Sequence, residues 1–191
     1  MRRRFTICAA AALAAAAAAG AWLAIRPSRP APGPLACPKC GVLGLSFRVD
    51  AQDPFTYGLL VLVNSGDRTA VLEEVEPLDA DPGLRLVGAV VVPTRVNPWN
   101  VTASDHHDFP PRNVADVVEP LRGYRVPPAR DNADGHEVML GFEVPGPGRF
   151  AFRRLAVDYH VGETRYRAIF RFRLRVCAPA RQRAVPCEPP R

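Results

Sequence analysis

The cysteines are the residues of this chain that can form covalent cross-links. Cys8 lies in an uncharged N-terminal run and has no obvious partner. The other four form an even set outside that run: Cys37, Cys40, Cys177 and Cys187. An even set is typical of disulfides in an oxidising compartment. We expect Cys37 or Cys40 to bond to Cys177 or Cys187, because such a bond closes a loop of roughly 140 residues, worth about 4–5 kcal/mol in the chain-entropy model.

The Cys37-Pro-Lys-Cys40 spacing also has two alternative interpretations. As half of a structural zinc site it needs a second close pair of ligands, whereas Cys177 and Cys187 lie far apart and have no histidine near them. As a redox-active disulfide it needs a strand–helix context, which the surrounding sequence does not offer.

One segment combines imidazole and carboxylate side chains. It consists of Asp105, His106, His107 and Asp108. These groups suit zinc, nickel or copper. Consecutive residues rarely all reach one ion, so a solvated loop is the main interpretation and a metal site the alternative. A blue-copper site is excluded because no histidine or methionine follows Cys177.

A row of arginines lies near the C-terminus, at every second position except Ile169. The row contains Arg165, Arg167, Arg171, Arg173 and Arg175. On a strand these residues share one face, with neighbours about 7 Å apart, so their charges repel one another. We expect either acidic partners from Glu73, Glu74 and Glu76 on a neighbouring strand, or an open surface for an anionic envelope component or an acidic protein. Nucleic acid is disfavoured, because no aromatic residue interleaves on this face.

No catalytic or cofactor signature accompanies these residues. None of Ser46, Ser65 and Ser104 lies in a Gly-x-Ser-x-Gly motif. No glycine-rich phosphate loop follows a predicted strand. The sequence therefore predicts a protein that is not an enzyme and uses no cofactor.

The N-terminus carries a targeting signal. Three arginines precede residues 5–25, which contain no charge and are long enough to cross a bilayer. The flanking charge places the N-terminus in the cytoplasm and the rest of the chain outside. Residues 1–25 then act as a signal anchor in a single-pass membrane protein, or as a signal peptide cleaved near Ala19-Gly20-Ala21 to release a secreted chain.

Beyond residue 25, the pattern favours strands joined by proline-marked turns. Residues 26–40 form a Pro-rich spacer, residues 41–177 a folded domain, and residues 178–191 a tail tied by Cys187. Alternating or continuous apolar runs predict strands at 42–49, 58–63, 69–77, 84–92, 138–144, 150–159 and 165–176. The 69–77 run also fits a helix, because Leu72, Val75 and Leu78 recur every three residues. A change of phase at Arg153-Arg154 predicts a β-bulge.

The stretch from 93 to 135 breaks this pattern. It is rich in Pro, Asn, Asp and His, and we expect it to be the least ordered part of the domain. Short strands near 114–118 or 124–126 are compatible with it.

The order of these elements resembles a known architecture. An apolar strand, the Asn64-Ser65-Gly66 turn, a Pro-Gly turn and a last strand ending at Cys177 resemble the immunoglobulin-like sandwiches of bacterial secreted or membrane-anchored proteins. The segments PLRGYRVPP (120–128) and VPGPGRFAFRRLAVDYHVGETRYR (144–167) share this resemblance. It implies an antiparallel β-sandwich of seven to eight strands and assigns no functional residue.

The functional expectation is accordingly a general one. We expect an extracytoplasmic, membrane-anchored domain with a non-enzymatic binding or structural role at the cell envelope. A metal-handling envelope protein using the Asp105–Asp108 loop is the alternative.

Overall fold

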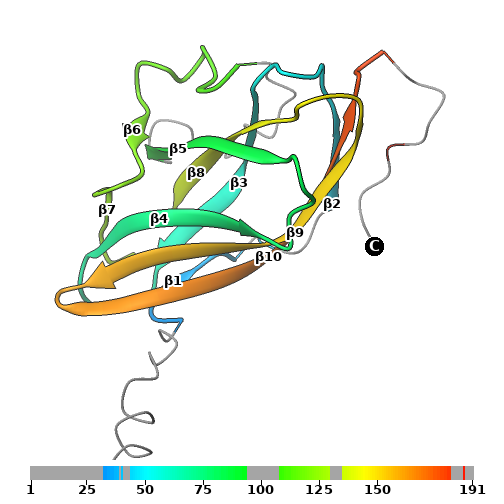
Figure 1. The fold of residues 1–191 in the computed structure, drawn as a ribbon. Helices are drawn as coiled ribbons and strands as arrows, with labels where there is room; N and C mark the ends of the chain where they lie inside the picture. The colour runs from blue at the N-terminus through cyan, green and yellow to red at the C-terminus, as the bar shows by residue number, and fades with distance from the viewer. Residues whose placement is uncertain are drawn as a thin grey trace, which may run out of the picture. The chain divides into compact units, whose positions relative to one another are not determined.

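The computed structural model describes residues 32–38, 40, 44–93, 108–129, 135–181 and 187. These residues form ten strands and no helix (Figure 1). The strands are β1 (Leu35–Ala36), β2 (Gly44–Arg48), β3 (Phe55–Asn64), β4 (Ala70–Leu78), β5 (Arg85–Pro93), β6 (Glu119–Pro120), β7 (Arg125–Val126), β8 (His136–Glu143), β9 (Gly148–Val161) and β10 (Thr164–Ala178). Three of them, β1, β6 and β7, have only two residues. The seven longer strands match the runs predicted from the sequence. The predicted membrane segment, residues 5–25, lies outside the described residues.

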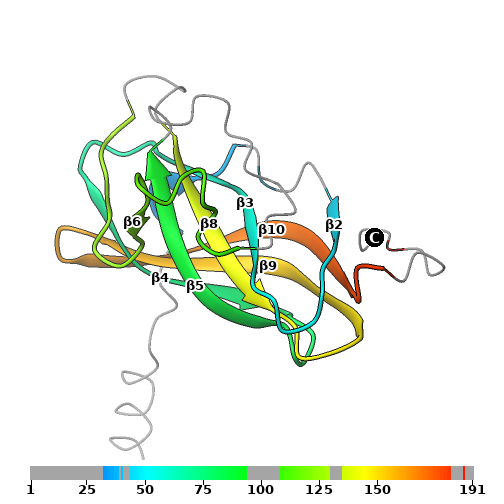
Figure 2. The same cartoon turned by 90° about the horizontal axis from the view of Figure 1, so that it is seen from above.

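The strands form two sheets whose order identifies the fold. One sheet has the order β1-β3-β8-β5-β6 and the other β2-β10-β9-β4-β7. If β1, β3, β4, β5, β8, β9 and β10 are lettered A to G, the sheets read A-B-E-D and C-F-G. This is the strand order of a constant-type immunoglobulin domain. The expectation of an all-β immunoglobulin-like sandwich is therefore confirmed by the connectivity (Figure 2).

One pairing contradicts the expectation that all strands are antiparallel. β2 runs parallel to β10, with Leu45 opposite Leu174 and Phe47 opposite Val176. No tight turn joins these two strands, because β2 leads directly into β3 in the other sheet. Turn chemistry therefore carried no information about the direction of this pair.

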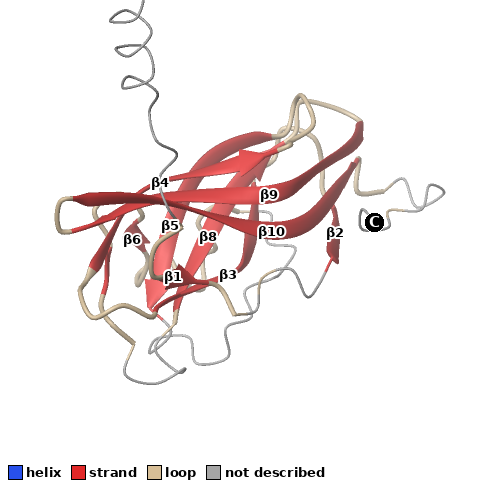
Figure 3. Ribbon diagram, turned by 90° about the horizontal axis from the view of Figure 1, so that it is seen from below, coloured by secondary structure: helices blue, strands red, loops and turns tan. Residues whose placement is uncertain are grey.

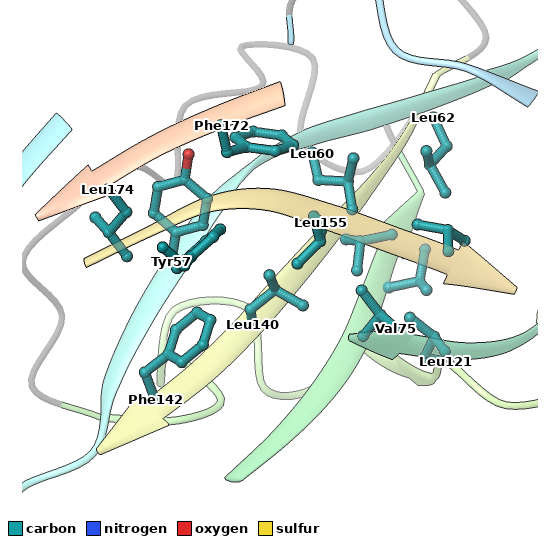
Figure 4. Packing of buried hydrophobic residues seen from close by; sticks show 14 of the residues in the cluster. Tyr57, Leu60, Leu62, Val75, Leu121, Leu140, Phe142, Leu155, Phe172 and Leu174 are labelled. Atoms are coloured by element: carbon teal, nitrogen blue, oxygen red, sulfur yellow. The ribbon is translucent and has the colours of Figure 1, made fainter. Parts of the chain in front are cut away.

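Large apolar side chains from both sheets meet in the core (Figure 4). The ring of Tyr57 on β3 makes edge contacts with Phe152 on β9 and Phe172 on β10, at centroid distances of 5.9 and 5.8 Å. Phe142 on β8 lies 5.3 Å from Phe152. All four rings are at most 3% exposed. Burying each such side chain contributes about 1.5–3 kcal/mol, so these contacts hold the sheets together.

β4 is a strand, and a bulge explains why its sequence also resembled a helix. Leu72 pairs with Tyr159 and Glu74 with Asp158, so β4 has one more residue than β9 at this point. The extra residue puts Leu72 and Val75 on the buried side although they are three apart. The helical interpretation of this spacing is therefore wrong, and the bulge leaves both Glu73 and Glu74 outside the core.

The irregularity predicted at Arg153-Arg154 is confirmed. Pairing between β9 and β10 is continuous up to Arg171 opposite Arg154, and then resumes at Leu174 opposite Phe152. Phe152 and Leu155 are both fully buried despite their odd spacing, while the two arginines between them are exposed. The shift therefore turns both arginines outward.

The described part of the 93–135 stretch, residues 108–129, contributes to the core. Val114, Leu121, Tyr124 and Val126 are each at most 8% exposed. Residues 112–117 form turns rather than the strand considered near 114–118, whereas the strand considered at 124–126 appears as β7. Residues 94–107 and 130–134 lie outside the described residues.

The sandwich begins earlier than the sequence indicated. β1 lies within the stretch predicted as a spacer, and it pairs with the end of β3. The Tyr159 hydroxyl donates to the carbonyl of Pro32 at 2.6 Å and accepts from the amide of Leu35 at 3.1 Å. The Ser65 hydroxyl donates to the carbonyl of Pro34 at 2.7 Å. These contacts bind residues 32–35 to β9 and to the β3–β4 turn.

Candidate functional site: a charged outer sheet face

The arginine row lies on the outer face of the β2-β10-β9-β4-β7 sheet. β10 alternates as predicted: Ala168, Phe172 and Leu174 are buried, and the arginines between them are exposed or half-buried. Ile169, at 49% exposure, interrupts the row. Figure 3 shows β9 and β10 running side by side along this sheet. The row therefore extends along β10, which lies between β9 and β2 at Arg173 and Arg175 and is paired with β9 alone, among the described residues, at Arg165–Arg171.

Acidic residues neutralise the half of the row nearest the β9–β10 turn. Arg167 donates to Asp158 on β9 at 2.7 Å and also to Glu76 on β4. Arg165 lies 3.9 Å from the carboxylate of Glu73. The same carboxylate lies 3.0 Å from His160 Nδ1. β4 does not pair directly with β10 as considered from the sequence; β9 separates them, and the acidic side chains reach across it.

The electrostatics of this half are dominated by carboxylates. Burial raises the pKa of Asp158, Arg167 opposes that shift, and the negative charges of Glu74, Glu76 and Glu73 add to it. Arg165 and Arg167 are thus already paired with carboxylates on β4 and β9. The carboxylates of this half outnumber Arg165 and Arg167, so it is not a basic surface.

The other half of the face is basic. It comprises Arg149, Arg153, Arg154, Arg171, Arg173 and Arg175. Arg154 pairs with Asp79 at 2.7 and 3.1 Å, and this hydrogen bond lowers the pKa of Asp79. Within the described residues, the other five arginines have no ion pair or hydrogen-bonded side-chain partner. They leave an uncompensated positive surface, which can bind anions but has no group suited to nucleophilic or acid–base chemistry.

Of the expected metal-binding loop, Asp105–Asp108, the structure describes only Asp108. Residues 105–107 lie outside the described residues. The carboxylate of Asp108 lies 3.0 Å from Arg112 Nε, and its carbonyl accepts a hydrogen bond from Thr56. Among the described residues, no three His, Cys, Asp or Glu side chains gather as a metal site would require. In the structure, Asp108 thus pairs with Arg112 and not with a group of metal ligands.

The four cysteines beyond residue 25 form two disulfides, neither of which is the expected bridge between the first pair and the second pair. Cys37 bonds to Cys40, and Cys177 bonds to Cys187. The expected bridges between the two ends of the domain are wrong. β1 places the first pair at the edge of one sheet, whereas Cys177 lies on β10 of the other. Cys187 Sγ lies 3.5 Å from the carbonyl of Phe47, so the second bond holds Cys187 beside β2.

Sequence reasoning missed several members of the charged face. Asp158 and Asp79 were not identified as arginine partners, and neither was the row formed by Arg125, Val71 and His160. In that row Val71 is the direct partner of both Arg125 and His160. The change of phase in β9 could have predicted that Asp158 faces outward, on the same side as the arginines. No feature of the sequence predicted that Arg125 pairs with Val71.

Comparisons with known proteins leave the chain without a family. No family model matches it, and no curated protein matches it. Among solved structures it is similar to the ASH / PapD-like domain of human CEP192 (PapD-like domain 7), with 12% identity, a TM-score of 0.36, and coverage of 81% of this chain and 92% of that one. It is also similar to the Vibrio cholerae VesB protease, with 5% identity, a TM-score of 0.31, and coverage of 70% of this chain and 30% of that one. These likenesses carry no functional argument. No helix within the described ranges is long and apolar enough to cross a membrane.

Proposed function

We propose that this chain is a non-enzymatic binding module of the bacterial cell envelope, and that the basic half of its outer sheet face binds a linear polyanion. The observation that carries the proposal is the set of arginines on one sheet face that form no ion pair within the described residues. Arg171, Arg173 and Arg175 lie on a single strand, and Arg153 and Arg149 flank them on β9.

The geometry of the row fits a polymer better than a single small anion. Outward residues on a strand are about 6.6 Å apart, so the three β10 arginines extend over about 13 Å. Each guanidinium can bind one carboxylate or phosphate through two parallel hydrogen bonds. A chain with repeated anionic groups can therefore occupy several arginines at once.

A lipid bilayer is a less suitable partner for this face. Surfaces that insert into a membrane interface carry several exposed apolar side chains. In the described part of the chain, the large exposed hydrophobic residues are Val87 and Ile169. Val87 belongs to β5 in the other sheet, so Ile169 stands alone among the charges.

The location is part of the same proposal. The charge-flanked run at 5–25 supports display outside the membrane, either anchored or after cleavage. The two disulfides support an oxidising compartment. An envelope polymer that carries phosphate or carboxylate groups is the partner that meets both conditions.

A charge-matched comparison tests the proposal. The variant R171Q/R173Q/R175Q removes three charges from the face, and R85Q/R112Q/R122Q removes three exposed charges from elsewhere. Affinity for heparin, polyphosphate and polyglutamate is measured over a salt series. We expect the face variant to bind at least about tenfold more weakly and to show a shallower salt dependence, because fewer counterions are released.

The control decides whether the effect is local. It should stay within about twofold of the parent chain, a difference of about 0.4 kcal/mol. Equal weakening in both variants would mean that net charge alone attracts the polymers. Stronger binding to anionic vesicles than to any soluble polymer would replace the polymer with a membrane surface.

A further inference from the structure

A second charged feature lies at the opposite end of the same sheet, where the β3–β4 turn, β7 and the end of β9 enclose an open groove of about 490 Å³. Its polar lining comes from Asp67, Arg68, Thr69, Arg125 and His160. Arg165 and Arg175 are ten positions apart on β10, so about 33 Å separates this end from the far end of the arginine row. The groove is therefore distinct from the polyanion surface.

Two guanidinium groups of the groove lack acidic partners. Arg68 and Arg125 are exposed, and neither takes part in an ion pair within the described residues. The nearby carboxylate of Glu73 pairs with His160 and Arg165, and not with either of these two arginines. The positive charge in the groove is thus available to a ligand.

A buried amide positions the two arginines relative to each other. Asn64 is fully buried, and its side-chain Nδ2 donates to the carbonyl of Arg68 at 2.8 Å and to that of Val126 at 2.9 Å. Its Oδ1 accepts from the amide of Gly66 at 3.0 Å, which shapes the turn. Because Val126 follows Arg125, this one side chain links the backbone segments that carry both guanidinium groups.

The guanidinium of Arg68 also packs closely against a glycine. A Cβ at Gly162 would overlap Arg68 Nη2, so the absence of a side chain makes room for the arginine. Gly162 has a φ of +59°, which fits the first central position of a type II′ hairpin turn. The turn and the Arg68 side chain therefore support each other at the rim of the groove.

We infer that this groove binds the phosphate ester of a small polyol. One guanidinium fork satisfies both oxygens of a carboxylate, whereas the additional oxygens of a phosphate can accept from two forks, here one in the β3–β4 turn and one on β7. The Thr69 hydroxyl adds a donor, and Asp67 supplies an acceptor for a ligand hydroxyl. A group with both a phosphate and free hydroxyls uses all four side chains. Such a group occurs in soluble glycerol phosphates and in the headgroup of phosphatidylglycerol.

Calorimetric titration of the full-length chain in neutral detergent tests the site. One arm adds glycerol 3-phosphate, and the other uses detergent micelles with and without phosphatidylglycerol. The Arg68→Gln/Arg125→Gln variant is compared with Arg171→Gln/Arg173→Gln, which removes the same charge from the distant row. We expect at least about tenfold weaker binding for the groove variant and less than about twofold change for the control.

The two arms identify the source of the phosphate. Loss of glycerol 3-phosphate binding in the groove variant supports a soluble ester, and loss confined to the phosphatidylglycerol arm supports a lipid headgroup. Absence of binding in both arms at about 10 mM, or equal weakening by the two variants, overturns the inference. The thermal midpoint of each variant checks folding, and Arg68→Lys/Arg125→Lys, which keeps the charge but loses the forks, should bind with intermediate affinity.

Discussion

Arg154 and Arg171 are directly opposed across β9 and β10, so two like charges face each other on the outer face of the sheet. Like charges at such positions destabilise a strand pair. Asp79 neutralises Arg154 through two hydrogen bonds, but Arg171 has no acidic side chain beside it in the described residues. A surface that keeps an unfavourable pair of this kind is consistent with a binding role for the cations.

The first prediction separates stability from binding at this pair. Arg171→Thr should raise the free energy of unfolding by about 0.2–1 kcal/mol, because it removes the repulsion and threonine suits a strand. The same change should weaken binding of polyphosphate. Urea melts and a binding isotherm measure the two effects. Arg85→Thr, which breaks an ion pair with Glu143, is the control and should not stabilise the domain. A loss of stability in the Arg171 variant would show that its charge is already compensated.

The second prediction concerns the titration of Asp79. The hydrogen bond from Arg154 holds the pKa of this carboxyl below its ordinary value. The ion pair therefore contributes stability above the ordinary carboxyl pKa of about 4, and this contribution is lost as the pH falls through the lowered value. Carboxyl-carbon NMR should show the low titration midpoint in the parent chain. In Arg154→Gln the midpoint should return toward the ordinary range; an unchanged midpoint would assign the shift to another cause.

The third prediction concerns Phe109, whose ring covers two opposed glycines in the other sheet. Gly88 on β5 pairs with Gly141 on β8, and a Cβ on either would overlap the ring. Gly141→Ala should destabilise the domain by about 1–3 kcal/mol, because the ring must move. In a Phe109→Ala background the same substitution should cost much less, which a double-mutant cycle measures. Additive effects would mean that the ring and the glycine do not interact.

The fourth prediction tests the disulfide pattern. Peptide mapping without reduction should recover Cys37 linked to Cys40 and Cys177 linked to Cys187. Cys177→Ser/Cys187→Ser opens a loop with a sequence separation of 10, which should cost about 3 kcal/mol in the chain-entropy model. The shorter Cys37–Cys40 loop should matter less, at about 2 kcal/mol. A peptide linking residue 37 or 40 to residue 177 or 187 would contradict this arrangement.

The sequence by itself determined the seven longer strands and most of the residues on them that face outward. The alternation along β10 predicted the exposed arginines, and the phase change at Arg153-Arg154 predicted the irregularity in β9. These properties are local, because side-chain direction in a strand has a period of two whatever its neighbours are.

Only the tertiary structure decided which strands and which side chains became neighbours. The parallel pairing of β2, the partnership of Arg167 with Asp158, and the two short-range disulfides all depend on chain segments brought together by the sandwich. The groove also depends on the tertiary structure, since Asn64 donates to the carbonyl of Val126, which is 62 residues away in the sequence. Alternation along a strand is the same for any choice of neighbour, so it cannot specify these contacts.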